Sequence, residues 1–212
     1  MLAFSGIDCS GKSTQIEKVN KELANEGHKT IIIWSRGGYT PLLEKIKTLI
    51  RSDKGATEEE KELYRENINR SNKKRKLLLF LSIIDLILYY GIYFRFIEKY
   101  EKKIIIADRY IWDSYIDFKM KYKEFNFEKW IVWRILTKVY YRPTCSIVYV
   151  IPVDESMRRS ELKNEPWPET KEQRVERIRY YKHLISKNKW QYEINALKSI
   201  DEVFTETMRA IK

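Results

Sequence analysis

Residues 6–13 read Gly6-Ile7-Asp8-Cys9-Ser10-Gly11-Lys12-Ser13 and follow directly on a short hydrophobic run at residues 1–4. The two glycines let the backbone curl, so that several N–H groups can point at phosphate oxygens. The helix expected from residue 14 adds its positive N-terminal end. Lys12 can then reach the β- and γ-phosphates of a nucleotide, and Ser13 can ligate Mg²⁺. The stretch predicts a phosphate-binding loop whose nucleotide contacts come from Gly6, Ser10, Gly11, Lys12, Ser13 and Thr14.

Around this loop, short hydrophobic runs alternate with longer segments that carry apolar residues at helical spacing. Strands are predicted over residues 1–4, 30–34, 104–107, 146–151 and 192–196. Helices are predicted over residues 14–27, 41–50, 57–76, 77–97, 127–141, 154–160, 171–189 and 200–211. The helices that meet at residue 76 are either continuous or separated by a break near Ser71-Asn72. We expect an α/β fold in a single domain, residues 1–212, with a five-stranded parallel sheet and helices on both faces.

The chain is strongly basic, with 41 Lys and Arg residues against 30 Asp and Glu residues and a formal net charge of +11. Such an excess favours anionic partners, which include nucleotides, nucleic acid and acidic membranes, or it forms a solvated basic surface. Cys9 and Cys145 lie far apart, and the two histidines are isolated, so no zinc site is expected. We interpret Cys9 as a small filler residue in the loop.

The apolar segment at residues 77–97 is long enough to raise the question of a membrane span. Asp85 near its centre and Arg95 near its end would each cost roughly 2.5–3.5 kcal/mol in hydrocarbon. A helix that is apolar on nearly every side can also be the central helix of a soluble core, and we favour that interpretation. No signal peptide is visible, so we expect a cytoplasmic protein without a membrane partner.

A second group of candidate site residues follows the hydrophobic strand at residues 104–107. Open parallel sheets bind ligands at the carboxyl ends of their strands, where Asp108 and Arg109 are expected to lie. Asp108 can hold Mg²⁺ or orient an acceptor, and Arg109 can grip a phosphate with two hydrogen bonds. The alternative is a helix cap with a structural ion pair. The other residues expected to contact the acceptor are Trp34, Arg36, Tyr110 and Asp113.

A third group consists of Arg158, Arg159 and Lys163, which precede a proline-bearing loop. Positive charges that close over a phosphoryl group stabilise it during transfer, and the phosphate-binding loop contains no arginine. We therefore expect a small lid at about residues 158–174, with Arg158 and Lys163 binding the nucleotide. The alternative is a solvated helix face. The residues expected to act in catalysis are Lys12, Arg159, Asp8 and Arg109.

These motifs resemble those of the thymidylate kinase family. The run from Phe4 to Thr14 looks like the family's F-x-G-x-D-G-S-G-K-S-T, and Asp108-Arg109-Tyr110 looks like the D-R-Y of its D-R-Y-x-x-S, with Ser114 after it. The resemblance implies a P-loop NTPase fold and transfer of the γ-phosphoryl group from ATP, with Mg²⁺, to a nucleoside monophosphate, dTMP. It also implies that Asp8 lies near the acceptor sugar, with Arg36 and Arg109 at its phosphate. Family members are commonly homodimers packed through long helices, which suits residues 77–97, and no nucleic acid partner is expected.

The positions that contact the base in this family are different in this chain. Ile84 stands where the family has an arginine, and Asp117-Phe118 stands where it has a Tyr-Gln pair. The acceptor is either a nucleoside monophosphate held by other contacts or another small metabolite, such as a nucleoside or a sugar. Asp113 and Asp117 could bind such an acceptor or only cap the helix that follows. A nucleotide-binding regulator with little turnover is a third hypothesis.

Overall fold

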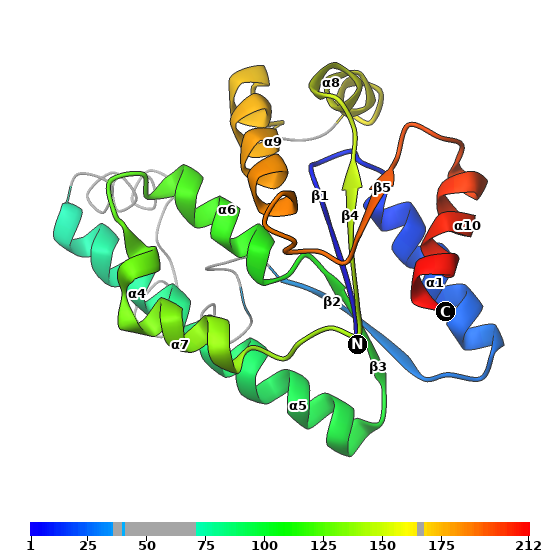
Figure 1. Ribbon diagram of the computed structural model, residues 1–212, viewed down its shortest axis with the longest axis horizontal. Coiled ribbons are helices and arrows are strands. Elements are labelled where there is room, and N and C mark those ends of the chain that lie inside the picture. The colour runs from blue at the N-terminus through cyan, green and yellow to red at the C-terminus, as the bar shows by residue number, and fades with distance from the viewer. Residues whose placement is uncertain (36–39, 41–70, 165–167) are drawn as a thin grey trace, which may run out of the picture.

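The computed structural model describes residues 1–35, 40, 71–164 and 168–212, and Figure 1 shows how they are arranged. The helix predicted at residues 41–50 and most of the one predicted at residues 57–76 lie outside the described residues. The candidate acceptor residue Arg36 and residues 165–167 of the expected lid lie outside them as well.

Within the described residues, five parallel strands form one sheet in the order β2-β3-β1-β4-β5. The strands are β1 (Leu2–Gly6), β2 (Thr30–Trp34), β3 (Ile104–Asp108), β4 (Cys145–Val150) and β5 (Tyr192–Asn195). The register pairs Phe4 of β1 and Trp34 of β2 with Asp108 of β3. The carboxyl ends of three neighbouring strands therefore meet at one edge, and the predicted five-stranded parallel sheet is confirmed.

Helices cover both faces of the sheet, as predicted (Figure 1). They are α1 (Lys12–Asn25), α4 (Asn72–Leu88), α5 (Phe94–Phe96), α6 (Ile111–Lys121), α7 (Ile131–Val139), α8 (Val153–Leu162), α9 (Lys171–Ile185) and α10 (Ile200–Ile211), with the π-helical turns η1 (Tyr89–Tyr93) and η2 (Ile97–Glu101) and the 3₁₀ turn η3 (Phe127–Lys129). Helix α6 is not among the helices predicted from the sequence. The single helix predicted at residues 127–141 is wrong, because Trp130 is extended, at φ −71° and ψ 141°, and separates η3 from α7.

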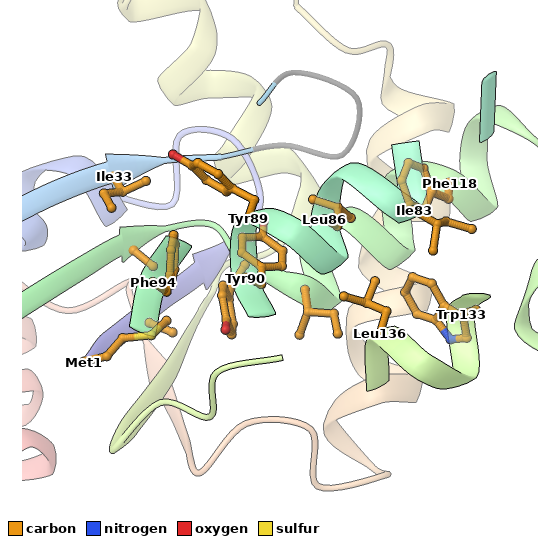
Figure 2. Packing of buried hydrophobic residues seen from close by; sticks show 14 of the residues in the cluster. Met1, Ile33, Ile83, Leu86, Tyr89, Tyr90, Phe94, Phe118, Trp133 and Leu136 are labelled. Atoms are coloured by element: carbon orange, nitrogen blue, oxygen red, sulfur yellow. The ribbon is translucent and has the colours of Figure 1, made fainter. Parts of the chain in front are cut away.

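The strands divide the core in two, because successive side chains of a strand point to opposite faces of the sheet. Ile105 and Ala107 pack on one face with Leu86 of α4, together with side chains of α6 and α7. Ile106 packs on the other face with Val19 of α1 and with side chains of α9 and α10. Figure 2 shows the first cluster, in which side chains of β2, α4, α6 and α7 gather around η1. Burying one such large apolar side chain contributes about 1.5–3 kcal/mol to stability.

The apolar segment is the centre of one continuous helical stretch from α4 to η2. Ser71 is extended and accepts a hydrogen bond from the backbone N–H of Lys74, so a helix begins there, at the break that the sequence suggested. Within the described residues, the stretch Asn72–Glu101 is the one helix long and apolar enough to cross a membrane, but half of its most hydrophobic window is buried in the protein. The inner face of this stretch contributes to the core cluster shown in Figure 2, which agrees with the prediction of a core helix.

Candidate functional site

The phosphate-binding loop connects β1 to α1, as the sequence predicts. Gly6, at φ 150°, could carry no side chain, because a Cβ there would lie 2.7 Å from Ser10 Oγ and 2.8 Å from the Tyr149 carbonyl oxygen. Gly11 is the N-cap of α1 and holds the left-handed conformation, at φ 82°. The two glycines therefore allow the sharp curl that brings the loop and the positive end of α1 to one cavity.

This cavity has a volume of about 560 Å³ and lies at the carboxyl edge of the sheet. It brings together most of the residues that the sequence singled out. Among the described residues, its walls are Ile7, Asp8, Cys9, Ser10, Gly11, Lys12, Ser13, Thr14, Gln15, Trp34, Asp108, Arg109, Arg159, Lys163, Ala196, Lys198, Ile200 and Val203. Strand ends and helix N-termini from both halves of the chain thus converge on the loop.

Lys12 and Asp108 form an ion pair in the floor of the cavity, with Nζ and Oδ1 2.6 Å apart. Both side chains are largely buried, at 9% and 16% exposure. Burial reduces screening by water, so the two charges interact more strongly than a surface pair would. The carboxylate at the end of β3 therefore neutralises the lysine of the loop.

Arg109 lies beside this pair in a strained conformation, at φ 72°, and is only 4% exposed. Its backbone N–H donates to the Phe4 carbonyl oxygen at 2.9 Å, and its guanidinium pairs with the Asp8 carboxylate. Burial alone would lower the pKa of this guanidinium, but the negative charges of Asp8 and Asp113 more than offset that effect and raise it. Among the described residues, Nη1 has no hydrogen-bond partner, and it lies 4.0 Å from Asp113 Oδ1.

Arg159 and Lys163 reach the cavity from α8 and the residue that follows it. Arg159 donates to Glu155 Oε1 at 2.6 Å and to the Ala196 carbonyl oxygen at 3.0 Å. A Cβ added to Gly11 would lie 3.9 Å from an Arg159 nitrogen, so this guanidinium lies next to the N-cap of α1. Hydrogen bonds from Arg158 and then from Arg159 lower the pKa of Glu155 to about 2, which keeps this carboxylate charged and the arginines oriented.

Three residues that are predicted to contact ligands do not line the cavity in this structure. Tyr110 is 3% exposed and packs on Phe94, with ring centroids 5.7 Å apart, because its side chain turns into the core as α6 begins. Asp113 is fully buried and accepts the backbone N–H of Tyr110, which favours the helix-capping alternative. Arg158 points outward from α8, where it donates two 2.8 Å hydrogen bonds to Glu155, and it does not line the cavity.

The sequence analysis missed a row of residues on α9 that supports the site. Arg174 is 1% exposed and donates to the Ser156 carbonyl oxygen at 2.8 Å, while Ser156 Oγ donates to the Asp8 carbonyl oxygen at 2.8 Å. Arg177 and Tyr181 follow on the same helical face and are also buried. Their spacing, i, i+3 and i+7, is the signal that could have placed them on one inward face.

A glycine-bounded phosphate loop, a lysine at the start of the next helix and converging arginines at the edge of a parallel sheet define a P-loop phosphotransferase. The sequence matches the family described as Thymidylate kinase over residues 4–207. The chain therefore belongs to the thymidylate kinase family, which supports a nucleoside monophosphate kinase function.

Individual relatives agree with this family. The chain is 30% identical over 216 aligned residues to a thymidylate kinase from Thermosipho melanesiensis (strain DSM 12029 / CIP 104789 / BI429), which covers 99% of this chain and 96% of that relative. It is also 38% identical over 81 residues to a thymidylate kinase from Thermosipho africanus (strain TCF52B), which covers 38% of this chain and 33% of that relative. The first of these similarities extends over nearly the whole of both chains.

Proposed function

We propose that this enzyme transfers the γ-phosphoryl group of ATP to a nucleoside monophosphate, and that dTMP is its first candidate acceptor. One observation carries the proposal: a single cavity contains the lysine of the phosphate loop and, beside it, the Arg109–Asp8 pair. The first group suits the phosphates of a donor, and the second suits the phosphate and sugar of an acceptor. Their adjacency is the arrangement that an in-line transfer requires.

On the donor side, the curled loop fits a nucleotide phosphate chain, because Gly11 in the cavity wall puts no side chain between the backbone and a ligand. Ser10 Oγ is buried without a hydrogen-bond partner among the described residues, so the loop also has a hydroxyl to offer. Lys12 would leave Asp108 and bind the β- and γ-phosphates. The chemistry of Ser13 and Asp108 fits Mg²⁺, which would neutralise the phosphate charge when bound.

On the acceptor side, Arg109 would bind the phosphate of the monophosphate, and Asp8 its sugar. Trp34 is half exposed in the cavity wall at the end of β2, where its ring can pack against the acceptor. Arg36, which the family resemblance also assigns to the acceptor phosphate, remains part of this proposal. Arg159 and Lys163 would supply the positive charge that the loop lacks as phosphoryl transfer proceeds, within a lid at about residues 158–174.

A second acceptor class has its own supporting observation. The two positions where the family has Tyr and Gln are engaged inside this protein, since Asp117 pairs with Arg177 at 2.7 Å and Phe118 is 2% exposed in the core. Neither side chain is placed to read a thymine base. An acceptor without thymine, such as a nucleoside or a sugar, is therefore the alternative.

We propose a cytoplasmic homodimer that binds small nucleotides and neither nucleic acid nor membrane. Support for the dimer comes from the outer face of the helical stretch from α4 to η2, where large apolar side chains remain exposed. Exposed apolar patches of this kind mark interfaces between protein chains.

The test is ATP consumption by the purified protein with Mg²⁺ and a panel of dTMP, dUMP, UMP, CMP, AMP and thymidine. We expect turnover with dTMP above the other acceptors. Turnover with thymidine would favour the second acceptor class. ATP binding without turnover on any member of the panel would favour it as well. Absence of both ATP binding and turnover would contradict the donor assignment.

A further inference from the structure

We propose that Asp113 is a positioning residue, which fixes the Arg109 guanidinium at the acceptor end of the cavity. The inference rests on the proposed function, in which Arg109 binds the acceptor phosphate. Asp113 touches no ligand in this scheme, because its side chain is fully buried and does not line the cavity. Its effect on the reaction passes through Arg109.

The Asp113 carboxylate is held from three elements at once. One oxygen, Oδ2, accepts hydrogen bonds from Ser5 Oγ of β1 at 2.5 Å and from the backbone N–H of Tyr110 at 2.9 Å. The other, Oδ1, accepts a hydrogen bond from the Tyr181 hydroxyl of α9. A buried carboxylate with this many partners has one well-defined position, and its negative charge is fixed with it.

Arg109 needs such a support because its own conformation is unfavourable. A non-glycine residue at φ 72° persists only where its surroundings impose that backbone conformation. The Arg109 guanidinium pairs with Asp8 through Nη2, and its Nη1 lies 4.0 Å from Asp113 Oδ1. The side chain is thus bracketed by two carboxylates, one at the cavity and one behind it. When the acceptor enters and Asp8 moves, the negative charge of Asp113 holds the Arg109 guanidinium in its place.

Tyr181 connects Asp113 to α9, the helix that begins at the end of the expected lid. Its ring packs on Trp190, with centroids 5.5 Å apart, and its hydroxyl reaches Asp113. Burial and then the Asp113 charge raise the pKa of Tyr181 well above its ordinary value, so the hydroxyl remains a hydrogen-bond donor throughout the neutral range. Tyr181 is therefore a second positioning residue, one step further from Arg109.

The first test needs no ligand. We would measure by NMR the exchange of the Arg109 Nε–H with solvent in wild type, Asp113→Asn and Tyr181→Phe. Asn retains an oxygen for the Tyr110 N–H but loses the charge, so exchange should become about tenfold faster in Asp113→Asn and less so in Tyr181→Phe. Exchange at the wild-type rate in Asp113→Asn would overturn the inference.

A matched control separates positioning from general loosening. Tyr149→Phe also removes a fully buried hydroxyl, which lies 2.9 Å from Thr207 Oγ1, and it keeps the aromatic ring. Tyr149 does not line the cavity, so Arg109 exchange should remain at the wild-type rate. Equal acceleration in Tyr149→Phe and Tyr181→Phe would count against the inference.

The second test uses turnover. Misplacing a group that orients a substrate by about 1 Å can cost up to roughly 10²-fold. We therefore expect the KM for the acceptor to rise about tenfold in Asp113→Asn, with the KM for ATP unchanged. A fall in kcat with both KM values unchanged would indicate a structural role and overturn the inference. If wild type phosphorylates no monophosphate, the proposed function fails, and the NMR exchange alone decides the role of Asp113.

Discussion

Two residues of the site hold the left-handed backbone conformation that side chains other than glycine rarely adopt. Cys9 lies at φ 60° in the phosphate loop, and Arg109 lies at φ 72° at the end of β3. For an L-residue this conformation costs roughly 1–2 kcal/mol, which the surrounding structure must offset. Both residues line the cavity, so part of the backbone strain of the described residues lies at the proposed ligand site.

Replacing Cys9 by glycine should stabilise the protein. Glycine removes the left-handed strain but makes the unfolded chain more flexible, so we expect a net gain of about 0.5–1 kcal/mol in the free energy of unfolding. Urea unfolding monitored by circular dichroism measures the change. Cys9→Ala is the control, because it deletes the thiol and keeps the strain. A Cys9→Gly protein that is no more stable than Cys9→Ala would refute the strain argument.

Lys12→Ala should abolish most turnover and leave the protein folded. Removing one group that stabilises the charge of a transition state costs about 10²–10³ in kcat, and Lys12, which lines the cavity, binds the transferred phosphoryl group in the proposed reaction. Steady-state kinetics with ATP and the best acceptor of the panel measure this loss. Lys18→Ala on the same helix breaks a surface pair with Asp201 and should retain full activity. Equal activity of the two variants would overturn the assignment of Lys12.

At the scale of the element, α9 shows how a charged helix can be part of the core. Its inward face carries Arg174, Arg177 and Tyr181, each of them buried. Arg177 is shared between Asp117 of α6 and Glu169, which precedes α9. Burial alone would lower the pKa of Arg177, but these two carboxylates more than offset that effect and raise it. The helix is therefore attached to α6 through an ion pair, and it reaches the site through the hydrogen bonds of Arg174 and Tyr181.

Arg177→Met should destabilise the protein by about 3 kcal/mol, because it removes the positive charge from a buried ion pair and leaves its carboxylates in place. Thermal or urea unfolding measures this loss. Arg179→Met is the matched control, since Arg179 is exposed on the same helix and its substitution should change little. A similar small effect for both variants would show that the Arg177 ion pairs contribute no net stability.

The contrast between β2 and α9 shows what the sequence could predict. The run from Thr30 to Trp34 is predicted with the observed bounds, because β-branched residues in a short block favour a strand, even in β2, where only Ile33 is buried. The buried side of α9 could not be predicted in the same way. Arginine in a helix is usually solvated, and the Asp117 that pairs with Arg177 lies 60 residues away in the chain.

The same distinction applies to the candidate site. The loop from Gly6 to Ser13 and the position of Arg109 follow from local spacing, which the sequence contains. The directions of Tyr110 and Asp113 do not, because they depend on the left-handed turn at Arg109 and on the packing of α6 against the core. Neither of these tertiary effects has a local sequence signal.

At the scale of the whole molecule, the chain places its charged cavity and its exposed apolar surface on different elements. The cavity lies at the carboxyl edge of the sheet, among β1, β3, α1 and α8. The apolar surface follows the helical stretch from α4 to η2 and the neighbouring α7 (Figure 1). Its exposed residues include Leu77, Leu81, Leu88, Ile92, Phe96 and Tyr100, with Ile131 and Ile135 of α7. A partner could cover this surface without closing the cavity.

Ile92→Glu should convert the protein from a dimer to a monomer. Ile92 is 62% exposed, and a carboxylate buried in an apolar interface would carry a large desolvation cost. Sedimentation velocity measures the mass of the particle for wild type, Ile92→Glu and the control Val175→Glu. Val175 is 50% exposed on α9, away from this surface, so its variant should remain dimeric. A wild-type monomer in solution would contradict the dimer, and cosedimentation of that monomer with lipid vesicles would indicate that the surface meets a membrane instead.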